Sequence, residues 1–136
     1  AYRRCLEFST NPDMEVATQY WLYLTLRRAG RDAEARELAV NIPAELELLE
    51  SGGYHRLLLL FRGDSSEDEV LGSAGSDEGA AVTDLSSATI GYGVGTHRLI
   101  SGDSEGAAEM YRRVVASPSW APFGYLAAEA ELARMN

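Results

Sequence analysis

Apolar residues recur at helical spacing along most of the chain. The first clear stripe lies between Asn11, a residue type that caps helices, and Gly30, which can end a helix in a left-handed turn. It consists of Met14, Ala17, Trp21 and Leu24. This pattern predicts a helix over 13–29. Residues 20–24 are apolar on every face, so we expect other elements to cover this helix from more than one side.

Further segments carry helix signals. One apolar stripe follows Asp103, and another follows Pro122, which fits a first helical turn. The four leucines at 57–60 have the composition of a buried strand as well as of a helix, and their helical neighbours favour the helix. The other predicted helices cover 32–40 with Asp32 as cap, 54–62, a short stretch capped by Ser66, 104–116 and 122–134, and the first residues of the chain also resemble the middle of a helix. Because no segment alternates convincingly between apolar and polar residues, the predicted fold class is all-α.

Acidic residues are concentrated in one segment. The chain carries 21 acidic and 12 basic residues, and six of the acids lie between Asp64 and Glu78 with no base among them. The overlapping segment 72–82 has no periodicity and no large side chain, so burial there cannot offset the entropy lost on ordering. We predict a flexible acidic loop over 72–82. An acidic docking segment is the alternative.

Charge and composition exclude several classes of partner. A net charge of −9 disfavours nucleic acid, whose phosphates are neutralised by cations, and the longest strictly apolar run, 57–61, is far too short to span a membrane. Cys5 is the only cysteine, so the chain has no internal disulfide and no pair of thiols. A cytoplasmic location is slightly favoured.

All twelve bases are Arg, which is typical of a GC-rich bacterial genome. Since the chain opens without an initiator Met or signal sequence, we expect it to be a piece of a longer protein.

A helix, a Gly and a second helix recur in that order three times. Gly30, Gly63 and Gly102 mark the three turns, and they lie 33 and 39 residues apart. An Ala follows five residues after the first and third of these glycines, at Ala35 and Ala107. Spacing of this kind indicates a helical repeat.

These residues resemble the tetratricopeptide repeat, a helix-turn-helix unit of about 34 residues. Its order of a small residue, a turn Gly, an Ala, an aromatic and a closing Pro is matched at Gly95, Gly102, Ala107, Tyr111 and, one residue early, Pro118. The resemblance implies one domain over 1–136, a right-handed α-solenoid of antiparallel helix hairpins. Its parts would be an orphan second helix at 1–10, units at 13–41, 44–72 and 84–117, and a terminal helix at 121–135.

The resemblance also implies a function, because the first helices of such units line a concave groove. We expect a non-catalytic scaffold that binds a peptide or protein segment in this groove. The residues placed there are Tyr20, Leu24, Arg27, Tyr54, Tyr92 and Thr96. The alternative for Tyr20 and Tyr92 is that they only pack between helices. An orphan helix at 1–10 would leave an apolar edge uncovered, so a homodimer through this helix is also expected.

The Gly-rich segment 91–95 offers an alternative function. Clustered glycines can cradle phosphate, and His97 follows this segment. Either histidine of the chain could act as a general base near Asp84 or Glu109, because the unperturbed pKa of His lies close to neutral. This would give a small-molecule-binding or hydrolytic domain. However, Gly91 and Gly95 are one helical turn apart, which favours close helix packing instead.

The two histidines, His55 and His97, lie far apart in sequence, and neither has a second ligand at metal-binding spacing. We therefore predict structural histidines, no metal site and no cofactor.

Overall fold

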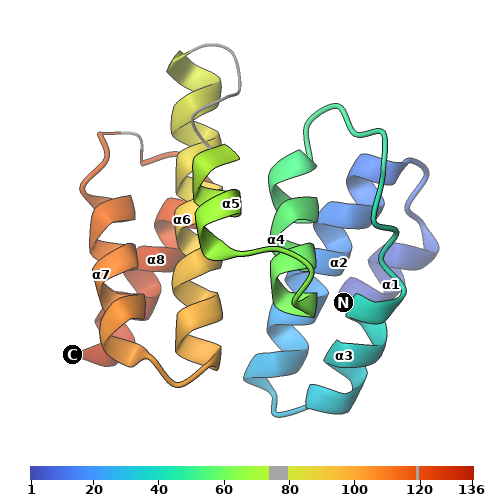
Figure 1. Cartoon of the computed structure of the whole chain (residues 1–136), viewed down its shortest axis with the longest axis horizontal. Coiled ribbons are helices and arrows are strands. Elements are labelled where there is room, and N and C mark those ends of the chain that lie inside the picture. The colour runs from blue at the N-terminus through green and yellow to red at the C-terminus, as the bar shows by residue number, and fades with distance from the viewer. Residues whose placement is uncertain (74–79, 119) are drawn as a thin grey trace. The chain divides into compact units, whose positions relative to one another are not determined.

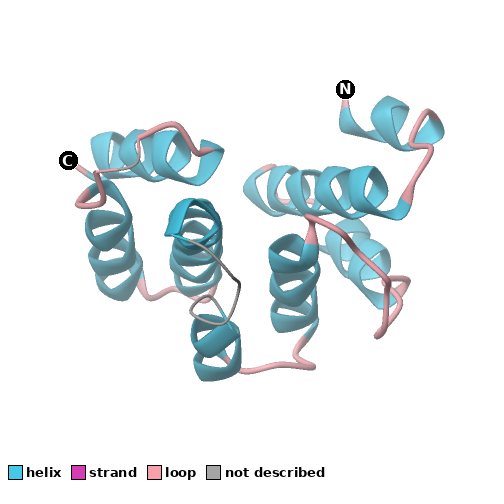
Figure 2. Cartoon of the chain, turned by 90° about the horizontal axis from the view of Figure 1, so that it is seen from above, coloured by secondary structure: helices cyan, strands magenta, loops and turns pink. Residues whose placement is uncertain are grey.

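The computed structural model describes residues 1–73, 80–118 and 120–136, and for residues 80–86 it describes the backbone only. In this described part the elements are helices joined by loops, with no strand (Figure 2). The all-α prediction is confirmed to this extent. The leucine run 57–60, for which a strand was an alternative, lies in a helix.

The chain divides into two compact units, Ala1–Ser66 and Glu67–Asn136 (Figure 1). The first contains α1 (Tyr2–Glu7), α2 (Pro12–Arg28), α3 (Asp32–Val40) and α4 (Gly52–Arg62). The second contains α5 (Glu67–Ser73), α6 (Ala80–Ile100), α7 (Ser104–Val115) and α8 (Phe123–Met135). The expected middle unit, 44–72, extends across this division, with α4 in the first unit and α5 in the second.

In the first unit, α2 is the central helix. It packs against α1, α3 and α4, which explains why its middle is apolar all round. Tyr20, Tyr23 and Leu24 of α2 are buried, as the sequence predicted for an inner helix. The antiparallel turn from α2 to α3 is made at Gly30, whose φ of 71° lies in the left-handed region that favours glycine (Figure 1).

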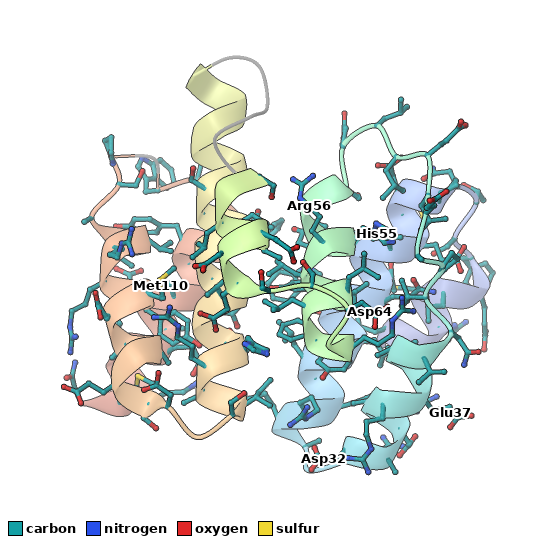
Figure 3. All side chains as sticks on the ribbon, viewed as in Figure 1. Asp32, Glu37, His55, Arg56, Asp64 and Met110 are labelled. Carbon is teal, nitrogen blue, oxygen red and sulfur yellow. The ribbon has the colours of Figure 1, made fainter. Side chains whose placement is uncertain are left out.

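Polar side chains fasten the long loop between α3 and α4. The carboxylate of Asp13, in the first turn of α2, accepts hydrogen bonds from the backbone N–H groups of Leu49, Glu50 and Ser51 at 3.1, 2.8 and 2.7 Å. These bonds, led by the one from Glu50, hold the pKa of Asp13 below its usual range. At the other end of the loop, the His55 ring Nε2 lies 2.7 Å from the carbonyl oxygen of Pro43 (His55 is labelled in Figure 3). The loop therefore has a defined path without secondary structure.

In the second unit, α6 and α7 form an antiparallel hairpin, and α8 packs against both. The hairpin turns at Gly102, whose φ is 93°. The helices approach closely at Gly91 and Gly95, which have no side chains. A Cβ added at Gly91 would lie 2.5 Å from a methyl of Val114, and one added at Gly95 would lie 2.6 Å from the ring of Tyr111. The packing interpretation of Gly91 and Gly95 is thus confirmed.

Several helix ends match the sequence analysis. Asn11 accepts a hydrogen bond from the Met14 N–H at 2.9 Å, and Asp103 accepts one from the Gly106 N–H at 2.8 Å, as expected of capping residues. Gly63 ends α4 in the left-handed conformation, at φ 93°. The three glycines that mark the predicted turns therefore all have positive φ.

Other boundaries differ. Residues 72–73 end α5 and residues 80–82 begin α6, so these parts of the expected loop 72–82 are helical, while 74–79 lie outside the described residues. Asp32 is the first residue of α3 and not its cap, a position taken by Arg31, and the carboxylate of Asp32 pairs with Arg27 at 3.0 Å. Pro122 takes the N-cap position of α8, in an extended conformation, and not the first turn.

Candidate functional site

Four of the six residues predicted to line a groove are buried. Tyr20, Leu24, Tyr92 and Thr96 expose 0%, 4%, 7% and 2% of their surface, while Arg27 and Tyr54 are half-buried. Tyr20, Leu24, Arg27 and Tyr54 lie in the first unit, and Tyr92 and Thr96 lie in the second. Buried side chains offer little surface to a ligand.

The buried aromatic residues contact partners from their own unit. The ring of Tyr20 lies 4.8 Å from that of Tyr54, on α4. The ring of Tyr92 stacks on that of Tyr111 at 5.7 Å, and the Thr96 hydroxyl lies 3.0 Å from the Tyr111 hydroxyl. Tyr20 and Tyr92 thus pack between helices, which was the alternative interpretation of these residues.

Arg27 also has internal partners. Its guanidinium pairs with the carboxylate of Asp32 at 3.0 Å and donates a hydrogen bond to the Tyr23 hydroxyl at 3.0 Å. The carboxylate that pairs with Arg27 therefore comes from the start of the next helix. Sequence reasoning missed this pair because it assigned Asp32 to helix capping.

The Gly-rich segment 91–95 lies inside α6 and is not a loop. Its backbone N–H groups take part in a continuous helix, so they do not form a cradle for phosphate at a helix start. His97, on the next turn of α6, does have a carboxylate partner. The Nδ1 atom of His97 lies 3.0 Å from Glu67 of α5, and Glu67 was not among the partners considered for it.

Glu67 joins α5 to α6 through two residues. Its second carboxylate oxygen pairs with the guanidinium of Arg98 at 2.8 Å. Partial burial opposes ionisation of Glu67, but the hydrogen bonds from Arg98 and His97 outweigh it and lower the pKa of this carboxyl. Since α5 is a short helix, this cluster anchors it to α6. No sequence signal links Glu67 to residues 30 positions further along the chain.

The outer face of α8 is apolar and exposed. Its buried face consists of Gly124, Ala128 and Glu131. A Cβ added at Gly124 would lie 2.5 Å from the carbonyl oxygen of Ala88, so the small residues of α8 face α6. The α8 outer face, with Trp120 just before the helix, is formed by Trp120, Phe123, Leu126, Ala130 and Ala133.

The large side chains of this face are well exposed. Trp120, Phe123 and Leu126 expose 70%, 74% and 47% of their surface. Sequence analysis predicted the helix but did not predict which of its faces is exposed. The signal that could have found this face is the pair Gly124 and Ala128, one turn apart, because a helix that packs closely through small residues turns its large ones outward.

No protein-family model, curated protein or solved structure matches this chain. Function therefore has to be inferred from the side chains themselves. Among the described residues, no group of three or more His, Cys, Asp or Glu side chains is placed to hold a metal ion, and no helix is long and apolar enough to cross a membrane. The α8 outer face is the feature with the clearest functional meaning, because large exposed apolar patches mark interaction sites.

Proposed function

We propose that the chain is a non-catalytic protein-interaction module that binds a segment of another protein at the α8 outer face. The observation that carries this proposal is the exposure of Phe123 and Leu126 on the first turn of α8 and of Trp120 just before it. Aromatic side chains dominate the energetics of protein interfaces, because they bury a large area with little loss of conformational freedom.

The geometry favours an apolar helix as the bound segment. The face follows one side of α8, and a second helix can lie along such a stripe with its own apolar side chains between those of α8. The second unit, 67–136, carries 11 acidic residues and four arginines. We therefore expect basic residues beside the apolar face of the partner, and an association rate that falls as salt concentration rises.

We also propose that the hairpins belong to a tetratricopeptide-like solenoid. Two features support this proposal. The same packing order occurs in both units, since α4 packs against both helices of the α2–α3 hairpin and α8 against both helices of the α6–α7 hairpin. In both hairpins the turn is a Gly with positive φ, at Gly30 and Gly102.

Few of the groove residues expected from this resemblance remain available to bind a partner. Arg27 and Tyr54 keep part of their surface exposed, but Tyr20, Leu24, Tyr92 and Thr96 are taken up by packing. The α8 outer face replaces these four residues as the proposed binding surface.

Site-specific photo-crosslinking in the producing cells tests the function. A benzophenone side chain is placed at Phe123 and, as a matched control, at Val40, an apolar residue of α3 that is 69% exposed. We expect adducts with another protein at position 123 and none of these at position 40. Absence of a protein adduct at 123, or the same adducts at both positions, would contradict the proposal.

A further inference from the structure

An open pocket of about 320 Å³ lies in the second unit, between α6 and α7. Its apolar lining consists of the half-buried Leu71 of α5 and of five buried residues, Ala88, Ile90 and Gly91 of α6 and Met110 and Val114 of α7 (Met110 is labelled in Figure 3). The volume is far larger than one water molecule needs, and it lies at the lower end of the range of small-molecule sites.

One cation lines this pocket. The guanidinium of Arg113 lies against the Met110 sulfur, with an N–S distance of 3.8 Å, and a thioether is only a weak acceptor. No acidic side chain is among the described residues that line the pocket.

Two of the other three arginines of the unit have carboxylate partners, which Arg113 lacks among the described residues. Arg98 pairs with Glu67 and Arg134 with Glu131, whereas in the described part of the chain no carboxylate lies within ion-pair distance of Arg113. An exposed arginine beside an apolar cavity is suited to a ligand that brings its own negative charge.

We infer that this pocket binds a small organic carboxylate with an apolar body. The planar guanidinium of Arg113 can donate two parallel hydrogen bonds to a carboxylate, which ammonium groups do not match. The hydroxyl of Ser87, also at the pocket, can donate to the same group. The apolar body would then lie against Leu71, which is the half-buried apolar residue of the lining. This inference is independent of the proposed binding of a protein at α8.

In the test, the whole chain is titrated with each of three probes, and binding is measured from the amide chemical shifts in its NMR spectra. The probes are octanoate, its neutral analogue octanamide, and acetate, which carries the charge without the apolar body. We expect saturable binding of octanoate with shifts at residues of α6 and α7 around the pocket. Octanamide and acetate should bind at least about tenfold more weakly, because each lacks one of the two recognised parts.

Two variants and a matched control sharpen the test. Arg113→Gln should weaken octanoate binding roughly ten- to hundredfold, the loss expected for a hydrogen bond to a charged group, and leave octanamide binding unchanged. Arg112→Gln removes the exposed neighbouring charge, which does not line the pocket, and should change octanoate affinity less than about twofold. Ser87→Phe, at an exposed position, should fill the pocket and abolish binding without unfolding the chain.

Three results would overturn the inference. The first is equal octanoate affinity in the wild type and Arg113→Gln. The second is equal affinity of octanoate and octanamide in the wild type, which would make the pocket apolar without anion recognition. The third is the absence of saturable octanoate binding. This result would count against the inference even if a peptide with a C-terminal leucine, which also carries a carboxylate, were to bind.

Discussion

Gly124 of α8 lies so close to Ala88 of α6 that a side-chain carbon at Gly124 would be 2.5 Å from the Ala88 carbonyl oxygen. This oxygen belongs to the backbone of a helix, so it cannot move aside as the end of a flexible side chain can. The contact sets the orientation of α8, because it holds the Gly124 side of the helix inward and turns the Phe123 side outward.

Replacement of Gly124 by Ala should therefore destabilise the second unit. We expect a loss of about 1–3 kcal/mol in the free energy of unfolding, the usual cost of overpacking. Urea denaturation followed by circular dichroism measures it. The control is Gly72→Ala in α5, where an added Cβ meets nothing within 4 Å; this change should stabilise the chain by about 0.4–1 kcal/mol. Equal effects of the two substitutions would show that the contact with Ala88 does not constrain α8.

Asp13 should make the stability of the first unit depend on pH. Hydrogen bonds from the backbone of the α3–α4 loop lower its pKa in the folded state, so its contribution is complete above the pKa of an unfolded aspartate. The contribution is lost as pH falls through the lowered folded value. In thermal melts, Asp13→Asn should lower the melting temperature at neutral pH, and the difference from the wild type should shrink in strong acid. A difference that stays constant from neutral pH into strong acid would argue against this role.

The uncovered α1 predicts self-association. Tyr2 and Phe8 expose 36% and 67% of their surface, so the first helix leaves apolar area in contact with water. We expect light scattering of the chain at high concentration to detect a dimer, and Phe8→Ser to reduce it. Leu49→Ser, at an apolar loop residue that is 95% exposed, is the control and should leave the dimer unchanged. A monodisperse wild-type monomer would contradict the prediction.

Local signals in the sequence were sufficient for most of the helices and for the glycine turns. The exception is α6, whose segment was not among the helices predicted from apolar spacing. Gly30, Gly63 and Gly102 were predicted from their positions between helical segments, and each has the positive φ that a left-handed turn requires. The caps at Asn11 and Asp103 were likewise predictable, because a cap bonds to a residue three positions away.

Contacts between distant segments were not predictable in the same way. Glu67 pairs with His97 and Arg98 because α5 packs against α6. The spacing of these residues in the sequence does not predict that packing. Tyr20 and Tyr92 were placed in a groove because the repeat resemblance puts them on the helices that line it. Tyr suits both interfaces and cores, and only the helices that pack beside these residues decide between the two.

The orientation of α8 was missed for a related reason. The helix is apolar on several sides, so periodicity alone did not separate a buried face from an exposed one. The close approach at Gly124 decides it, and it leaves Phe123 and Leu126 in contact with solvent.

The most direct test of the proposed function measures how much of the partner identified by crosslinking stays bound when the α8 outer face is made polar. The double variant Phe123→Ser and Leu126→Ser is compared with the wild type and with Val40→Ser, which removes an exposed apolar residue elsewhere. We predict that the double variant keeps its helical circular dichroism and binds the partner at least about tenfold more weakly, while Val40→Ser binds as the wild type does. Unchanged affinity in the folded double variant would contradict the account.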